Sequence, residues 1–202
     1  MTGIWLGSST TIGQLEHLCR HLIETAANNT NNSDNSNGNG TGGDNDLSYK
    51  TRVLQAIVDQ LRWFASTPIR NAASVGGNLI TASPIGDLAP IYMAMDATGL
   101  IYNCDTQQYR TVPIRQFFVD YRQVDVRANE LFIGLYLPLG QQSMEFVKAY
   151  KQSRRREDDI AIVTSGMRMT IEMRPQQQAQ ITQQEQNGEQ QASRVLVVPT
   201  IT

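Results

Sequence analysis

Thr67-Pro-Ile-Arg-Asn-Ala-Ala-Ser-Val-Gly-Gly-Asn-Leu-Ile-Thr-Ala-Ser-Pro-Ile-Gly-Asp-Leu-Ala-Pro90 is the stretch of this sequence that decides how the rest is interpreted. It is rich in Gly, Ser, Thr, Ala and Asn, but its only charged residues are Arg70 and Asp87. This composition predicts a close-packed loop with many exposed backbone donors rather than a solvated linker. We therefore expect a ligand to lie against it.

The pair Gly76 and Gly77 allows the main chain to approach a ligand closely and to adopt a positive φ. Short hydroxyl and amide side chains surround the pair: Ser74, Asn78, Thr81 and Ser83. Such donors suit a phosphate or a sugar-phosphate. The alternative is a tight turn between two buried strands, which composition alone favours.

The composition of the whole chain limits its class. The 202 residues suffice for one domain or two small ones. A content of 40% hydrophobic residues is enough for a globular core, and a formal net charge of −2 argues against a nucleic-acid partner. Cys19 and Cys104 lie outside any CxxC spacing, which favours a reducing compartment and argues against both a disulfide framework and a metal knuckle. The sequence has no basic leader and no run of about 18 apolar residues, so we expect a soluble cytoplasmic protein without a membrane partner.

The first third of the chain predicts a strand at residues 3–8 and then a helix. Thr11 and Gln14 form a capping-box signature at the start of that helix. Its apolar stripe consists of Ile12, Leu15, Leu18, Cys19, Leu22, Ile23 and Ala26. His17 and His21 lie four residues apart on its flank, but without a third ligand they are predicted to be solvated rather than metal-bound.

Residues 28–46 are almost purely Asn, Gly, Ser, Thr and Asp, which predicts a disordered insertion. The next helical stripe runs from Val53 to Ala65, and Pro68 is predicted to end that helix. Residues 88–94 are expected to form a helix or packed turn, with Met93 and Met95 as core filler.

Residues 100–104 and 109–112 predict a hairpin, residues 113–121 a short helix or turn, and residues 130–138 a strand. Pro138 and Gly140 then mark the best candidate boundary between two subdomains.

Beyond this boundary, residues 144–151 predict a strand, and residues 160–173 predict a helix or strand leading into a strand. Residues 175–194 are Gln-rich and of low complexity, and residues 195–202 are too few to fold alone.

Two long strings resemble a known family. Ser74-Val-Gly-Gly-Asn78, followed by Thr81-Ala-Ser-Pro84 and Asp87-Leu-Ala-Pro90, is similar to the flavin-binding loop of the molybdenum hydroxylases, the family of xanthine dehydrogenase and aldehyde oxidase. Ala149-Tyr-Lys-Gln-Ser-Arg-Arg-Arg-Glu-Asp-Asp-Ile160 resembles a second signature of that family, and its charged run favours the xanthine dehydrogenase branch. The similarity extends from about Gly3 to Arg174, interrupted by the Asn-rich insertion.

The resemblance implies an α+β fold with a flavin between two subdomains. Residues 1–139 would form the second half of a PCMH-type FAD-binding domain, including the disordered insertion at 28–46. Residues 144–174 would begin the C-terminal flavoprotein subdomain, and residues 175–202 would be a Gln-rich disordered tail.

The resemblance also implies a set of cofactor-binding residues. The family's FAD contacts fall on Phe64, Ala73, Ser74, Gly77, Asn78, Thr81 and Asp87, with Phe132 at a flavin-ring contact and Lys151 near the flavin. Gly86 stands where the family usually has a serine. The charged loop around Arg155, Arg156, Asp158 and Asp159 would lie by the flavin and influence access of nicotinamide, and its alternative is a solvated charged turn. No catalytic residue and no metal ligand are expected.

The implied function is electron transfer from iron-sulphur clusters through FAD to NAD or oxygen, in a homodimeric cytoplasmic or peroxisomal oxidoreductase. The family's upstream glycine segment, iron-sulphur cysteines and molybdopterin domain have no counterpart in this sequence, so we expect a fragment truncated at both ends. Such a fragment would lack hydroxylase activity and bind FAD weakly or not at all.

Two other functions stay open on the sequence alone, so whether the chain is an enzyme stays open as well. One is a non-enzymatic remnant or interaction module that binds no cofactor. The other is a nucleotide-binding regulator that keeps adenine or phosphate contacts without redox turnover.

Overall fold

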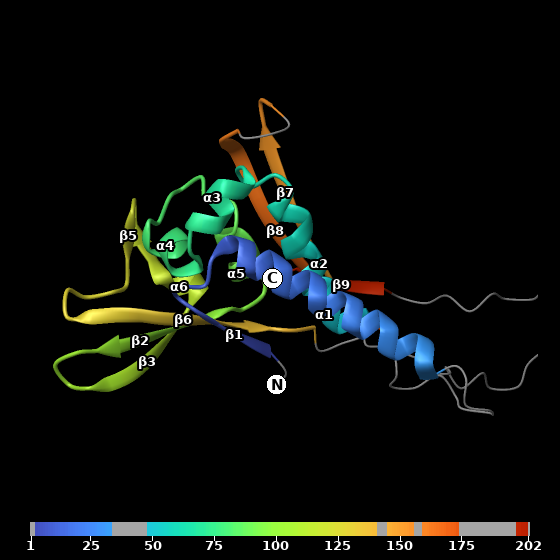
Figure 1. Ribbon diagram of the computed structural model, residues 1–202, viewed down its shortest axis with the longest axis horizontal. Helices are drawn as coiled ribbons and strands as arrows, with labels where there is room; N and C mark the ends of the chain where they lie inside the picture. Colours follow the sequence, from blue (N-terminus) through green and yellow to red (C-terminus); the bar gives the residue numbers. More distant parts are fainter. Residues whose placement is uncertain (1–2, 34–47, 141–144, 156–158, 174–196, 202) are drawn as a thin grey trace, which may run out of the picture.

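The computed structural model describes residues 3–33, 48–140, 145–155, 159–173 and 197–201. Helices and strands both contribute to the fold, as the predicted α+β class requires (Figure 1). The first sheet is four-stranded, in the order β1-β6-β2-β3. Its strands are β1 (Gly3–Gly7), β6 (Glu130–Pro138), β2 (Thr98–Asn103) and β3 (Gln108–Pro113), all antiparallel to their neighbours. The predicted first strand, hairpin and strand at 130–138 are therefore confirmed.

Helix α1 (Ile12–Ser33) begins with the predicted capping box. The Thr11 N–H donates to Gln14 Oε1 at 2.9 Å, and the Gln14 N–H donates to Thr11 Oγ1 at 3.1 Å. The helix extends to Ser33, so the first part of the stretch 28–46 is helical instead of disordered. Extending a helix that is already nucleated adds one hydrogen bond per ordered residue, which offsets the poor propensity of Asn and Thr. Residues 34–47 lie outside the described part of the chain.

Helix α2 (Ser48–Leu61) ends earlier than predicted, and Pro68 does not end it. Pro68 instead lies in the first turn of the next helix, α3 (Thr67–Ala72), where its missing N–H costs no hydrogen bond. The connecting turn includes Ala65, whose φ of 32° is positive.

The stretch 67–90 is largely helical, so the prediction of a close-packed loop with many exposed backbone donors is wrong. It contains α3, then α4 (Val75–Ile80), and reaches the start of α5 (Ala89–Ala94) after a series of turns. Neither Gly76 nor Gly77 adopts a positive φ. A Cβ at Gly76 would lie 2.8 Å from the carbonyl oxygen of Ser8, so this glycine allows α4 to approach the end of β1.

The second sheet is three-stranded, in the order β7-β8-β9. The predicted strand at 144–151 is confirmed as β7 (Glu145–Ser153). Residues 160–173 were predicted to be a helix or strand leading into a strand, and they form the single strand β8 (Ala161–Met173). β9 (Val197–Ile201) pairs with β8, so these residues of the predicted tail form a strand. Residues 174–196 lie outside the described ranges.

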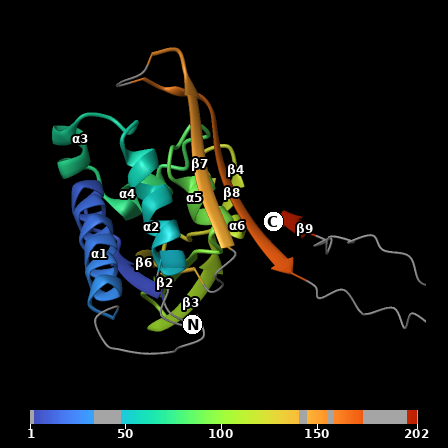
Figure 2. The ribbon, with the colours of Figure 1, turned by 90° about the vertical axis from the view of Figure 1, so that its right-hand side faces the viewer.

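Helix α6 (Ile114–Phe117) leads into a small hairpin of β4 (Phe118–Asp120) and β5 (Gln123–Val124). Helix α2 lies against β7, and α5 lies against β8 (Figure 2). One hydrophobic core runs through these elements, and Met95 is buried in it while Met93 packs against its edge, as expected. This packing brings the turn after α2 and the segment after α4 next to the second sheet.

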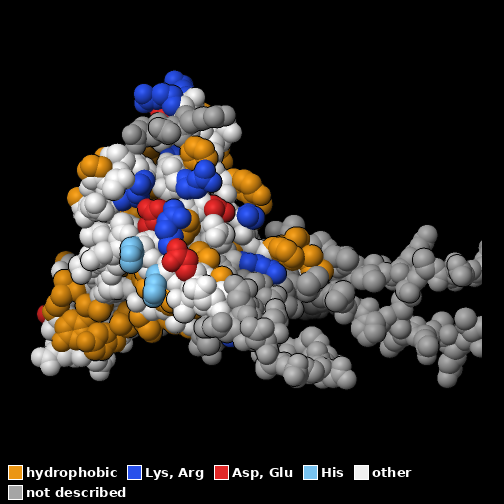
Figure 3. Space-filling view, turned by 45° about the vertical axis from the view of Figure 1, so that its right-hand side comes forward, with side chains coloured by type: hydrophobic (Ala, Val, Ile, Leu, Met, Phe, Trp, Pro, Cys, Tyr) orange, Lys and Arg blue, Asp and Glu red, His pale blue; other side chains and the backbone are white. Residues whose placement is uncertain are grey.

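The two histidines of α1 lie on the surface, where Figure 3 shows both side chains in view. Among the residues with a described position, no group of three His, Cys, Asp or Glu side chains could hold a metal ion. The described helices also include none long and apolar enough to span a membrane.

Candidate functional site

A cavity of about 520 Å³ lies where four parts of the fold meet. The turn after α2 contributes Phe64, α4 contributes Asn78, the segment between α4 and α5 contributes Asp87, and β7 contributes Lys151. These four residues are among those implicated by sequence. The other lining residues are Ala65, Ser66, Ile69, Ser83, Ile85, Gly86, Asp159, Ile160 and Ala161.

Asp87 and Lys151 form an ion pair in the wall of the cavity. Lys151 Nζ lies 2.9 Å from Asp87 Oδ2, and the two side chains are 4% and 13% exposed, respectively. Lys151 Nζ also donates a hydrogen bond of 2.7 Å to the carbonyl oxygen of Trp63. One lysine of the second sheet therefore holds both the segment after α4 and the turn after α2.

Two residues that sequence reasoning missed complete the environment of Asp87. Gln60 Nε2 donates to the Asp87 carbonyl oxygen at 3.1 Å, and Thr164 Oγ1 donates to Asp87 Oδ1 at 3.4 Å. Gln60 is only 1% exposed although it lies within the apolar stripe of α2. A buried glutamine in such a stripe was the available signal, because buried polar groups need hydrogen-bond partners.

Asp159 also lines the cavity. Its Oδ2 accepts a hydrogen bond of 2.7 Å from the backbone N–H of Arg155, and its Oδ1 accepts one of 3.0 Å from the backbone N–H of Ile160. The backbone N–H of Arg155 is the main reason why the pKa of Asp159 lies below its ordinary value. The carboxylate therefore closes the turn between β7 and β8. Arg156 and Asp158 of the predicted charged loop lie outside the described residues.

Ser74, Gly77 and Thr81 lie together around α4 but do not line the cavity. Ser74 caps α4 by accepting a hydrogen bond of 3.0 Å from the Gly77 N–H, and Thr81 Oγ1 donates one of 2.7 Å to the Gly77 carbonyl oxygen. The Gly76 N–H donates to the Ser8 carbonyl oxygen at 2.9 Å. The amides of both glycines thus bond within the chain, in contrast to the predicted exposed donors.

Ala73 and Phe132 lie elsewhere. Ala73 follows α3, and its carbonyl oxygen accepts a hydrogen bond of 2.8 Å from Ile12. Phe132 is 9% exposed on β6, its ring centroid lies 5.4 Å from that of Phe117, and it belongs to the hydrophobic core. Their contacts with a cofactor stay predictions.

The cavity combines an aromatic ring and aliphatic walls with a few polar groups. Phe64, Ile69 and Ile85 provide the apolar surface, and the amide of Asn78 and the hydroxyls of Ser66 and Ser83 provide hydrogen-bonding groups. Its volume falls within the range of about 300 to 1,000 Å³ that is typical of small-molecule sites. The arrangement suits a planar heterocycle with apolar faces and a polar edge.

The family model described as "FAD binding domain in molybdopterin dehydrogenase" matches residues 1–140. Xanthine dehydrogenase 2 of Arabidopsis thaliana is 46% identical over 130 residues, which cover 64% of this chain and 10% of that protein. Xanthine dehydrogenase of Oryza sativa subsp. japonica is 42% identical over 169 residues, which cover 84% of this chain and 11% of that protein. The chain thus spans about a tenth of the length of these relatives.

Among solved structures, the fold is similar to a chain of the reconstituted CO dehydrogenase from Oligotropha carboxidovorans, with a TM-score of 0.62 and 18% sequence identity. That match covers 85% of this chain and 49% of the other. A chain of quinoline 2-oxidoreductase from Pseudomonas putida 86 matches with a TM-score of 0.51 and 19% identity, over 64% of this chain and 41% of the other. Identities this low support a shared fold alone.

Proposed function

The chain belongs to the family of FAD binding domains in molybdopterin dehydrogenases, and from this membership we propose that its cavity receives the flavin ring of FAD. The observation that carries the proposal is the convergence of Phe64, Asn78, Asp87 and Lys151 on one cavity from four separate parts of the chain. These residues were implicated by family resemblance, independently of any cavity.

The chemistry of the lining residues fits a flavin. An isoalloxazine ring has large apolar faces, which Phe64 and the isoleucines would cover, and a polar edge, which the amide of Asn78 and the nearby hydroxyls would meet. FAD, when bound, supplies the electron transfer, and the protein contributes binding, orientation and electrostatics. The chain's own task is therefore to hold one face and one edge of the ring.

The Asp87–Lys151 ion pair supports this task by fixing the walls of the cavity. Because Lys151 reaches both Asp87 and the carbonyl oxygen of Trp63, it holds Asp87 and the turn that carries Phe64 at fixed positions.

We further propose that NAD or oxygen accepts the electrons, and that Asp159 borders the side from which the acceptor approaches. The support is the position of Asp159 in the cavity lining, where it also holds the β7–β8 turn. The chain spans only about a tenth of the xanthine dehydrogenases that it matches, so we expect no hydroxylase activity from this chain alone.

FAD binding tests the proposal directly, with protein fluorescence or calorimetry as the readout. Asn78→Ala removes the amide from the cavity and should weaken binding about fivefold to tenfold, the loss expected for one hydrogen bond of about 1 to 1.5 kcal/mol. The matched control is Gln116→Ala, which removes an exposed amide on α6 and should leave the affinity unchanged. Equal affinities for wild type and Asn78→Ala would contradict the assignment of this cavity.

A further inference from the structure

One wall of the candidate flavin cavity belongs to the second sheet. Four lining residues lie on β7, at the start of β8 or in the turn between these strands: Lys151, Asp159, Ile160 and Ala161. The lining residues from Phe64 to Asp87 form the opposite wall. The distance between the two walls therefore depends on how β8 packs against the segment that follows Asp87.

Alternate residues of β8 contact this segment in register. Thr164, Gly166 and Arg168 are two positions apart on the strand, so they face the same side of the second sheet. We call these three residues the β8 row. In chain order, the row meets three residues of the segment 87–96: Asp87, Pro90 and Asp96. The segment contains α5, which lies beside β8 in Figure 2.

The middle residue of the row, Gly166, allows the backbones of β8 and α5 to approach closely. A Cβ at Gly166 would lie 2.6 Å from the carbonyl carbon of Pro90 and 2.8 Å from the backbone nitrogen of Ile91. Both atoms belong to the backbone of α5, so no side-chain rotation could relieve the contact. A larger residue at position 166 must therefore move β8 away from α5.

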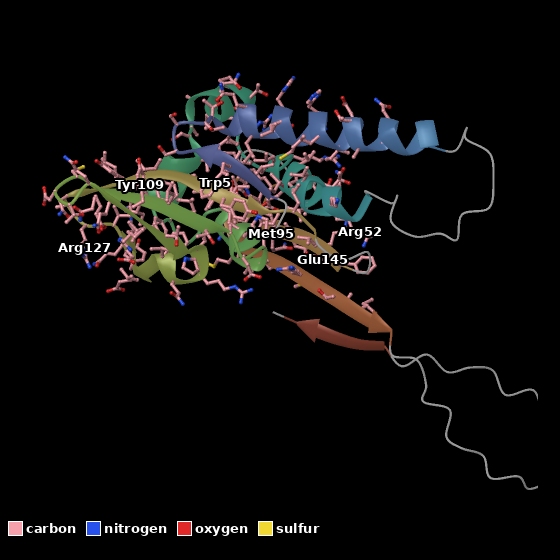
Figure 4. The ribbon with its side chains drawn as sticks, turned by 90° about the horizontal axis from the view of Figure 1, so that it is seen from below. Trp5, Arg52, Met95, Tyr109, Arg127 and Glu145 are labelled. Atoms are coloured by element: carbon pink, nitrogen blue, oxygen red, sulfur yellow. The ribbon has the colours of Figure 1, made fainter. Side chains whose placement is uncertain are left out.

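Arg168 connects the same two elements at the next position of the row. Its Nε donates to Glu145 Oε1 at 2.8 Å, and its Nη1 donates to Asp96 Oδ2 at 2.7 Å. The side chains of Arg168 and Glu145 are only 19% and 2% exposed, so salt screens this pair little. In Figure 4, the labels of Glu145 and of Met95, which precedes Asp96, mark the regions that Arg168 joins.

The β8 row also determines the position of Lys151. Thr164 lies directly opposite Lys151 in the β7–β8 pair, and Ala149, two residues before Lys151, lies opposite Gly166. From these contacts we infer that Gly166 and Arg168 are positioning residues: they hold the wall that carries Lys151 at a fixed distance from Asp87, and thereby set the affinity of the cavity for the flavin. Neither residue lines the cavity. The effect on FAD rests on the proposed function, whereas the effect on the wall does not.

The size of the expected displacement supports a measurable effect. Carbon atoms in contact lie about 3.5 to 4.0 Å apart, so relieving the contact made by Gly166→Ala requires β8 and α5 to separate by about 1 Å. Residues of a binding site must be held within about 0.5 Å of their productive geometry. A displacement of this size therefore moves Lys151 out of the position that the cavity requires.

Calorimetric titration of the full chain with FAD measures the effect on affinity, at a temperature where urea denaturation shows that every variant is folded. Gly166→Ala and Arg168→Met should each raise the Kd for FAD at least about fivefold, because each displaces a wall of the cavity. Arg168→Met serves as the second variant in case Gly166→Ala does not fold. The wild-type chain provides the reference Kd.

Arg110→Met is the matched control for Arg168→Met. Arg110 also bridges a buried glutamate and a more exposed aspartate, Glu130 and Asp125, but it does so in the first sheet, on β3. Its substitution should lower the stability by a similar amount and leave the Kd for FAD unchanged. A purely structural role of Arg168 predicts that the two variants bind FAD equally well.

Hydrogen exchange of the Lys151 ammonium protons, measured by NMR without FAD, separates this inference from the proposed function. These protons are buried and bonded to Asp87 and Trp63, so a displaced wall should speed their exchange in Gly166→Ala and Arg168→Met but not in Arg110→Met. Exchange at the wild-type rate in both variants overturns the inference, and so does an unchanged Kd in both. A wild-type chain that binds no FAD contradicts the proposed function instead, and the exchange rates alone then decide the inference.

Discussion

Lys151 Nζ lies 2.9 Å from Asp87 Oδ2, and this ion pair joins the second sheet to the segment between α4 and α5. The pair is almost completely buried, with side-chain exposures of 4% and 13%. The same two residues line the candidate flavin cavity. We therefore expect stability and cofactor binding to be coupled at this point of the fold.

The losses in stability from breaking the pair on either side should not add in the double variant. Lys151→Met and Asp87→Asn each leave one buried partner without its counterpart, so each should lower the free energy of unfolding by about 3 to 5 kcal/mol. The double variant should lose clearly less than the sum of the two, as urea denaturation would measure. Lys148→Met is the control, since Lys148 is 61% exposed and lies 3.9 Å from Asp59, and it should cost less than about 1 kcal/mol. Additive losses in the double variant would contradict the coupling.

Gly76 and Gly77 should respond differently to alanine. A Cβ at Gly76 would meet the backbone of Ser8 at 2.8 Å, so Gly76→Ala should cost about 1 to 3 kcal/mol in stability. A Cβ at Gly77 would meet only the Ser74 hydroxyl at 2.9 Å, and the better helix propensity of alanine offsets part of that cost. In thermal unfolding, Gly77→Ala should therefore have a clearly higher Tm than Gly76→Ala. The reverse order would show that the close approach to β1 does not explain this pair.

Glu130 should make the stability depend on acid pH. The Arg110 side chain, which donates to both carboxylate oxygens, and the Arg127 N–H lower the pKa of Glu130 from 4.5 to about 2. Because the folded pKa lies below the unfolded one, the stabilisation is complete above about pH 4.5 and is lost as the pH falls toward 2. Glu130→Gln should therefore be less stable than wild type near pH 7, by about 1.5 to 3 kcal/mol, with the difference shrinking toward pH 2. A pH-independent difference would be inconsistent with this ion pair.

The two cysteines should differ sharply in reactivity. Cys19 is buried on α1, and burial raises its pKa to about 12, whereas Cys104 is exposed. Since the thiolate is the reactive form, a thiol reagent should label Cys104 rapidly in the native chain and Cys19 only after unfolding. Cys104→Ser should abolish the rapid phase and leave the slow one. Rapid labelling of Cys19 would contradict the packing of α1 against the core.

Much of the secondary structure could be predicted because local patterns and tertiary packing agree. Interactions between residues close in the sequence determine three of these features: the capping box at Thr11, the hairpin around residues 105–107 and the alternation along β6. The prediction for the stretch from Thr67 to Pro90 failed because local pattern and tertiary packing disagree there. Its small residues were interpreted as a close-packed loop with exposed backbone donors. Gly76 instead allows a close contact with Ser8, which is distant in the sequence, and no local pattern indicates such a contact.

The candidate site shows the same division. The family resemblance identified Phe64, Asn78, Asp87 and Lys151, which the fold brings to one cavity. They did not indicate that Asp87 and Lys151 bind each other, nor that Gln60 and Thr164 hold Asp87, because these contacts depend on how α2, β7 and β8 pack. Pairings between distant elements require the three-dimensional structure.

An NMR titration of the isotope-labelled chain with FAD tests the central claim most directly. With FAD raised to about 1 mM, even an affinity of only about −4 kcal/mol would be detected. The account predicts saturable shifts that centre on Phe64, Asn78, Asp87 and Lys151 and spread to Gln60 and Thr164. Absence of saturable shifts at these residues, or shifts confined to another part of the surface, would contradict it.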